Sequence, residues 1–338
     1  MMIIDDVYNT TVGAPELAVR APSIHNSQPW RCWLTERTLH LFAAADRWLP
    51  ATDADHRDLL LSCGAMLHHL VVALRAAGVR PTVHRIPNPA VEDHLAALEL
   101  RAEPTSNADI GLARPVAARR SDRRPFTSWE VPEAFLAELV EQAAERGAVL
   151  RAIKDDGDRQ TVLDAIREAE AIQRTTPGYQ HELATWTGRS LSDDGVPVAS
   201  LLQETATRAD AARDFPTGDL SAISREPDGA VLLVLGTASD DRMSQLRAGE
   251  AMSAVLLRAT QAGLATCPLS QPLEVPSTRR LLEEQVLGGA LTPQLILRVG
   301  FAPSGPPRST GSRHVRATAR LIGDRHAEPL RGPTKGWS

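Results

Sequence analysis

The stretch DADHRDLLLSCGAMLHHLVVALRAAG, residues 53–78, predicts the central element of the fold. Leucine, methionine and valine recur on every side of the helix that it would form, and a helix that is apolar all round is a buried one. Asp53 and Asp55 stand in the cap region before this helix, a position that favours capping over a metal-binding or acid–base role. Gly78 stands at the C′ position, where glycine commonly ends a helix. The sequence therefore predicts a long buried helix that runs to about Ala77.

A second stretch, DDRMSQLRAGEAMSAVLLRATQAG (240–263), repeats this pattern. Four polar or glycine positions match at a constant separation of 185 residues: Asp55 with Asp240, Arg57 with Arg242, Gly64 with Gly249, and Gly78 with Gly263. Two alanine-rich helices could share aliphatic positions by coincidence, but four matching polar or glycine positions in one register favour an internal duplication. We expect a first half over residues 1–106 and a second over 107–338, arranged like the two subunits of a symmetric dimer.

Other segments alternate between helix and strand, which predicts an α+β fold. Apolar runs predict strands at 31–35, 39–44, 95–102, 148–153, 231–237 and 294–300. Helical periodicity predicts one helix that starts near Asn107 and others at 132–145, 158–187 and about 276–285. Residues 188–229 show little periodicity and many glycines and prolines. Irregular segments of this length in a compact domain are usually lids or binding loops, so we expect a lid here.

Composition excludes several classes of protein. The 338 residues are 43% hydrophobic, enough for a substantial core, and the net charge of −5 argues against a nucleic-acid binder. Cys32, Cys63 and Cys267 have no disulfide or metal-site spacing, so we expect no metal, and we expect Cys63 and Cys267 to be core thiols. No 18-residue apolar run or basic leader occurs, which predicts a cytoplasmic protein without a membrane span.

Two polar motifs carry the candidate chemistry. The loop APSIHNSQPW (21–30) holds short polar side chains between prolines, and ARRSDRRPF (118–126) concentrates arginines around a serine. Arginine suits phosphate because its planar fork forms two charge-assisted hydrogen bonds. A turn without a ligand and a solvated basic face are the alternative interpretations.

Together these segments resemble the nitroreductase family of flavoproteins. APSIHNSQPW is similar to its PSxxNxQPW loop, ARRSDRRPF to its RxSxR-type phosphate motif, and AGLATCPLSQP (262–272) with QLILRVGFAP (294–303) to its flavin-flanking turn and penultimate strand. The resemblance is greatest to the Acg-type subgroup of actinobacterial proteins and extends to TWTGR (185–189) and GVP (195–197). It implies a nitroreductase-like fold whose duplication lets one chain mimic the family's homodimer.

The resemblance also implies one FMN per chain, because each half keeps a different half-site. The first keeps the PSIHN loop, while the second keeps the arginine motif but has lost the loop near 143–153. The implied FMN-binding residues are Pro22, Ser23, Ile24, His25 and Asn26 from the loop; Arg119, Arg120, Ser121 and Arg123 from the motif; Leu269, Ser270 and Gln271 from the turn whose amide faces flavin N5; and Arg313 from the tail. Gln28 and Trp30 are interpreted as structural, and no catalytic side chain is assigned.

Three functions stay open at this stage. The fold family implies an NAD(P)H-dependent flavin oxidoreductase acting on an electron-poor aromatic acceptor. The lid, together with Ser270–Gln271 where the family often carries an acidic residue and glycine, instead favours FMN sequestration, storage or sensing without turnover. An interaction scaffold without flavin is the third, and the two complementary half-sites argue against it. The chain would be a monomeric pseudo-dimer or a homodimer.

Overall fold

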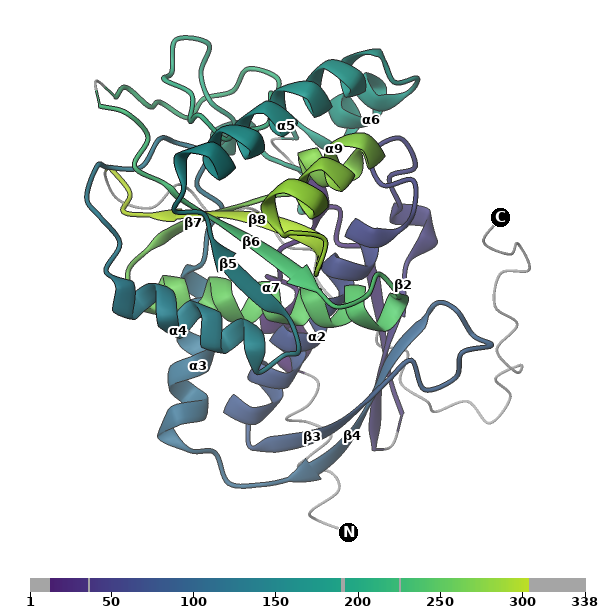
Figure 1. Cartoon of the computed structure of the whole chain (residues 1–338). Helices are drawn as coiled ribbons and strands as arrows, with labels where there is room; N and C mark the ends of the chain where they lie inside the picture. The colour runs from purple at the N-terminus through teal and green to yellow at the C-terminus, as the bar shows by residue number, and fades with distance from the viewer. Residues whose placement is uncertain (1–12, 36, 190–191, 225, 304–338) are drawn as a thin grey trace.

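Two antiparallel sheets enclose a pair of long helices in the computed structural model, which describes residues 13–35, 37–189, 192–224 and 226–303 (Figure 1). The first sheet contains β1 (Trp30–Leu34), β2 (Thr38–Ala43), β3 (Val79–Arg85) and β4 (His94–Ala102) in the order β1-β2-β4-β3. The second contains β5 (Val149–Ala152), β6 (Val231–Thr237), β7 (Ala265–Leu269) and β8 (Thr292–Gly300) in the order β5-β6-β8-β7. The α+β fold class is thus confirmed.

The long helices are α2 (Arg57–Ala76) and α7 (Arg242–Gln261), and each joins the second and third strands of its own sheet. Both predicted helix ends are confirmed, because Gly78 and Gly263 follow them with φ of +79° and +78°. Asp53 caps α2 as predicted, accepting the backbone N–H groups of Asp58 and Leu59 at 2.8 Å each. Although α2 is long and apolar enough to cross a membrane, 83% of that window is buried inside the protein.

Two glycines allow the backbones of α2 and α7 to come into close contact. A Cβ atom on Gly64 would lie 2.1 Å from the Leu246 carbonyl oxygen, and one on Gly249 would lie 2.1 Å from the Leu61 carbonyl oxygen. Only a residue without a side chain permits such an approach of two backbones. A hydrogen bond of 2.8 Å between His68 Nδ1 and Ser253 Oγ lies one turn further along the same contact. Residues separated by 185 positions therefore face each other across the helix pair.

The remaining helices cover the outer faces of this core. They are α3 (Asn107–Ala118), α4 (Glu133–Ala144), α5 (Asp156–Thr175), α6 (Tyr179–Trp186), α8 (Gln271–Glu274), α9 (Pro276–Leu281) and the turn η4 (Leu282–Val286). The helical run predicted over 158–187 is divided into α5 and α6 because Pro177 and Gly178 interrupt it; Gly178 has a φ of +80°. Figure 1 shows α5, α6 and α9 together on the side of the second sheet that faces away from α7.

The second sheet is buried on both faces, as the apolar run 231–237 predicts. Leu233 and Leu235 of β6 belong to the main core with α2, α7 and the first sheet, while Leu232 and Val234 pack into a second cluster with α5. This alternation follows from the two-residue period of a strand. The three cysteines are free and buried.

Candidate functional site

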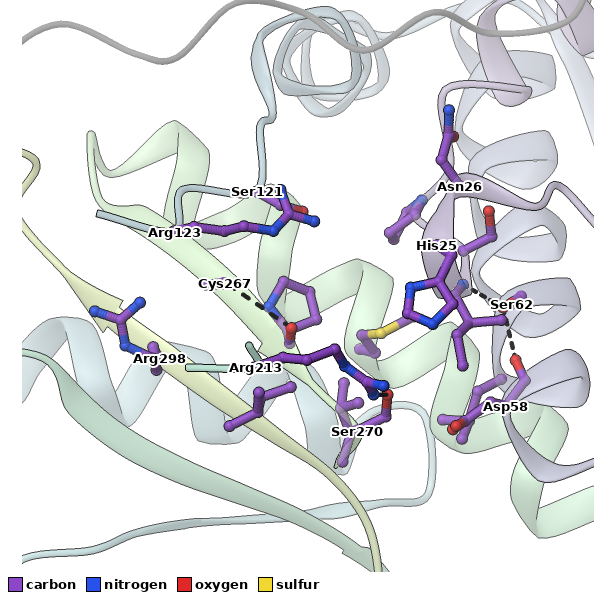
Figure 2. A pocket seen from close by; sticks show the side chains of 18 of the residues that line it. His25, Asn26, Asp58, Ser62, Ser121, Arg123, Arg213, Cys267, Ser270 and Arg298 are labelled. Atoms are coloured by element: carbon purple, nitrogen blue, oxygen red, sulfur yellow. Dashed lines mark hydrogen bonds between the residues drawn. The ribbon is translucent and has the colours of Figure 1, made fainter. Parts of the chain in front are cut away.

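A pocket lies between the start of α2 and the edge strand β7. Figure 2 shows His25, Ser62 and Asp58 on one side of it, with Arg123 and Arg298 on the other. The lining comes from segments far apart in the sequence: residues 20–26, Asp58, Leu61, Ser62, Arg119, Ser121, Arg123, Leu202, Arg208, Ala212, Arg213, Phe215, Met252, 267–270, Leu295 and Arg298.

The loop 22–26 forms one wall and is held in a strained conformation. His25, Asn26 and Gln28 have φ of 46°, 53° and 50°, in the left-handed region that non-glycine residues rarely adopt. Ser23 Oγ accepts the Gln28 N–H at 3.0 Å, and the Ile24 N–H donates to Ser62 Oγ on α2 at 3.1 Å. Such strain persists only where surrounding contacts impose it, often at ligand sites.

His25 points into the pocket as a neutral imidazole. It is 7% exposed, and its Nε2 has no hydrogen-bond partner among the described residues. Burial, and then the charges of Arg213 and Arg123, hold the pKa of His25 well below its usual value. A neutral ring with an open nitrogen can donate to or accept from a bound molecule.

Successive residues of the arginine motif point to opposite sides of the segment. Arg119, Ser121 and Arg123 line the pocket, whereas Arg120 does not and donates to the backbone carbonyls of Ala117 and Arg119 at 2.8 and 2.6 Å. Ser121 forms an isolated β-bridge with Thr266 beside β7, and extended backbone directs successive side chains to opposite sides. The structure therefore leaves Arg120, a predicted FMN-binding residue, outside the pocket lining.

Arg119 is an unpaired buried cation. It is 7% exposed, its Nε and Nη1 have no partner within the described chain, and its Nη2 reaches the Arg20 carbonyl at only 3.4 Å. Burial, and then the charge of Arg120, lower the pKa of Arg119 to about 10, so it stays protonated at neutral pH. A buried charge without a partner is costly, and an anion is the group that would offset this cost.

The turn after β7 closes the floor of the pocket. Of the residues of this turn that are predicted to bind FMN, Leu269 and Ser270 line the pocket, while Gln271 is turned away and donates from Nε2 to Gln173 Oε1 at 3.0 Å. Arg313 lies outside the described residues.

Residues from the predicted lid segment reach this pocket. The Gly195 N–H donates to the Asn26 carbonyl at 3.1 Å, and Asn26 Nδ2 donates back to the Gly195 carbonyl at 3.0 Å. Gln28 Nε2 donates to the Asp193 carbonyl at 2.8 Å, which agrees with its interpretation as a structural brace. Arg47 pairs with Asp194 beside these bonds. The segment is thus fastened to the loop 22–28.

Arg213 and Phe215, further along the segment, enter the pocket itself. The Arg213 guanidinium pairs with buried Glu274 and donates to the Tyr179 hydroxyl at 2.6 Å. The Phe215 ring lies edge-on to His25 at 5.8 Å and under the Arg123 guanidinium at 4.8 Å. The sequence prediction misses both residues, because nothing in the irregular segment marks which of its side chains turn inward.

Arg298 is a second buried guanidinium that the sequence prediction misses. It lies on β8 with no exposed surface, pairs with Asp228 at 2.7 Å, and has an Nε and an Nη1 without partners within the described chain. A charged residue in the apolar run QLILRVG is the signal that could have identified it. Among the described residues no group of three His, Cys, Asp or Glu side chains could hold a metal ion.

Comparison with known proteins gives relatives over most of the chain. The Mycobacterium tuberculosis H37Rv protein named "Putative NAD(P)H nitroreductase Rv3131" is 42% identical over 296 residues, covering 85% of this chain and 83% of the relative. "Putative NAD(P)H nitroreductase acg" from the same strain is 38% identical over 333 residues, covering 94% and 98%. No protein-family model matches.

Two solved structures are similar at lower identity. A Bacteroides fragilis nitroreductase with bound FMN has a TM-score of 0.39 and 14% identity, covering 60% of this chain and 94% of that one. The FMN-dependent nitroreductase NfnB from Mycobacterium smegmatis, in complex with NADPH, has a TM-score of 0.38 and 15% identity, covering 58% and 90%.

Proposed function

Because the chain belongs to the nitroreductase-like family that includes Acg, we propose that its pocket binds one FMN and that it acts as an NAD(P)H-dependent flavin oxidoreductase. The substrate to be reduced would be an electron-poor aromatic compound, and the location would be the cytoplasm. The observation that carries the proposal is Arg119, whose unpaired buried guanidinium faces the pocket beside Ser121 and Arg123.

A phosphate group fits these donors. It brings charge close to −2 at neutral pH and several acceptor oxygens, and Arg119 and the Ser121 hydroxyl offer donors to match. Arg123 is half-buried, and this partial burial lowers its pKa. Binding a dianion would offset the cost of holding these guanidinium groups next to each other in the pocket wall.

The other walls suit the remainder of FMN. Ser23, His25 and Asn26 place short polar groups where ribityl hydroxyls or the ring edge could bind, with Pro22 and Ile24 beside them. Leu269 and Ser270 supply the turn whose backbone amide would face the reactive edge of the ring. When bound, FMN would supply the hydride-accepting chemistry that no side chain provides. The chain's own contribution is to bind it, orient it and exclude water.

Two features support the proposed duplication into halves 1–106 and 107–338. The sheets share one strand order, with α2 and α7 in equivalent places. Residues separated by 185 positions touch each other, as Gly64 with Gly249 and His68 with Ser253 do. Positions related by a two-fold axis meet each other where that axis passes. The pocket then needs the loop of one half and the arginine motif of the other.

A second function, FMN sequestration without turnover, is favoured by one specific observation. Phe215 of the segment 188–229 lies inside the pocket between His25 and Arg123, and Arg213 is tied to Glu274 beneath it. A side chain in this place would restrict the approach of a second aromatic molecule to the flavin. We propose that the segment is a lid, and that its opening decides between the two functions.

We expect the Phe215→Ala substitution to open the pocket. Loss of the ring removes its contacts with His25 and Arg123 but leaves the Arg47–Asp194 anchor of the segment intact. Quenching of flavin fluorescence by iodide, measured on the loaded protein, should rise above that of the wild type. Ile223→Ala is the control, because Ile223 belongs to the same segment and is 84% exposed. Equal quenching in wild type and Phe215→Ala would contradict the lid.

Absorbance spectroscopy tests the function directly. The purified protein should be yellow, with flavin absorbance bands, and anaerobic addition of NADPH should bleach them if the protein is an oxidoreductase. Bands that stay unchanged would support sequestration. A colourless protein that does not take up added FMN would overturn both functions.

A further inference from the structure

Asp58, in the first turn of α2, is a buried carboxyl group on the pocket wall. It is 3% exposed and lines the pocket on the same side as His25 and Ser62 (Figure 2). Its Oδ1 accepts from Arg57 Nη2 at 2.9 Å and Arg57 Nε at 3.3 Å. Its Oδ2 has no hydrogen-bond partner among the described residues. The site therefore contains an oxygen that can meet a ligand.

The charges around Asp58 do not balance. Three buried carboxyl groups, Asp53, Asp58 and Glu274, share two buried guanidiniums, those of Arg57 and Arg213. The other nearby carboxyl group, on Asp55, is 60% exposed and lies 3.6 Å from Arg279. A buried carboxylate without a cation is costly, so a carboxyl group in this cluster takes up a proton more readily than an exposed carboxyl group does.

Of these three carboxyl groups, the one on Asp58 lines the pocket and has an oxygen without a partner among the described residues, so it is the one that a ligand can reach. Burial and the charge of Asp58 raise the pKa of Asp53 well above its ordinary value, and the backbone N–H groups of Asp58 and Leu59 that its two oxygens accept only oppose this shift. Glu274 is paired with Arg213 and accepts the Ser270 hydroxyl at 2.6 Å. Asp58 has an open oxygen. Burial raises the pKa of Asp58 to about 6, with Arg57 opposing the shift and Glu274 adding to it.

We propose that Asp58 is a hydrogen-bond donor to the cofactor: its Oδ2 carries a proton while FMN occupies the pocket and donates it to an acceptor oxygen or nitrogen of FMN. The inference rests on the proposed function. FMN brings both acceptor atoms and negative charge, and each of these favours the protonated acid. A carboxylic acid that an apolar site keeps neutral so that it can donate a hydrogen bond is known in an isomerase that contains no flavin.

The proposal links binding to proton uptake. Asp58 is largely ionised in the free pocket above pH 6 and protonated in the loaded pocket, so binding at pH 7.5 takes up close to one proton. The affinity for FMN should therefore be highest below the pKa that Asp58 has in the FMN-free protein. It should fall as the pH rises above that pKa, by up to about tenfold per pH unit.

Titration calorimetry of FMN into apoprotein at pH 7.5, in Hepes and in Tris, measures this uptake. These buffers differ in ionisation heat, and FMN phosphate is mostly dianionic at this pH, so it exchanges few protons itself. We expect close to one proton per FMN in wild type and none in Asp58→Asn. Asp55→Asn, a change to a nearby exposed carboxyl group, should match wild type. Binding without uptake in wild type, or equal uptake in Asp58→Asn, would overturn the inference alone.

A second measurement uses the wild-type protein, so it does not depend on whether a variant folds. Infrared difference spectra of wild type, FMN-loaded minus free, should contain the carbonyl band of a protonated carboxyl group that shifts on ¹³C-aspartate labelling. Absence of this band would refute the donor role while leaving FMN binding intact. A wild-type protein that binds no FMN would overturn the proposed function itself, and the inference with it.

Discussion

Substituting alanine for Gly64 or Gly249 is expected to destabilise the protein by about 3 kcal/mol, the upper end of ordinary overpacking. The new methyl group would lie 2.1 Å from a backbone carbonyl oxygen of the opposite helix in either case. Backbone oxygens cannot turn away as side chains do, so α2 and α7 must separate. Because the main core packs around both helices, their separation would also disturb the packing of the two sheets and lower the free energy of unfolding of the whole protein. Denaturant unfolding measures it.

Gly111→Ala is the matched control for these variants. Gly111 lies inside α3, and a Cβ there would have no atom within 4 Å. Alanine is favoured over glycine in a helix interior, so this variant should gain about 0.5–1 kcal/mol. Equal effects at Gly111, Gly64 and Gly249 would mean that helix propensity, and not the helix contact, determines the result.

Arg119→Ala is expected to weaken FMN binding about 100-fold, which corresponds to about 3 kcal/mol, or two charge-assisted hydrogen bonds. Its effect on the free protein should have the opposite sign. Removing a buried guanidinium with unpaired Nε and Nη1 relieves a desolvation cost, so the apoprotein should be as stable as wild type or more so. Fluorescence titration with FMN and thermal unfolding without it give the two measurements.

Arg120→Ala serves as the control, because it removes a side chain of the same type from the neighbouring position. Within the described part of the chain, Arg120 donates to the carbonyls of Ala117 and Arg119 and is absent from the pocket lining, so FMN affinity should stay within about twofold of wild type. Loss of affinity in Arg120→Ala as large as in Arg119→Ala would show that the pocket is not the phosphate site.

Much of the fold follows from periodicity in the sequence. The two buried helices and the strands β1, β2, β4, β5, β6 and β8 are predicted because apolar residues recur at the period of each element. The strands β3 and β7 are not. Each contains a proline, Pro81 or Pro268, and each lies at the edge of its sheet, where a missing N–H is tolerated. The edge strands β1 and β5 contain no proline, and both are predicted.

The candidate site is predictable where a motif is local. The PSIHN loop and the alternate residues of the arginine motif line one pocket, as does the turn at Leu269 and Ser270. The motif also points to Arg120, because charge alone does not distinguish the two sides of an extended segment. Asp58 and Arg298 belong to regular elements whose periodicity predicts burial, and a strand or helix pattern does not indicate that a buried charge faces a cavity.

Both walls of the pocket belong to one covalent chain, and this connection has a consequence at low abundance. A site shared between separate subunits is lost on dilution below their dissociation constant, whereas here the two walls stay tethered at any protein concentration. Occupancy by a ligand would then depend only on ligand concentration. A cell could keep very few copies of such a protein and still have every one of them competent to bind.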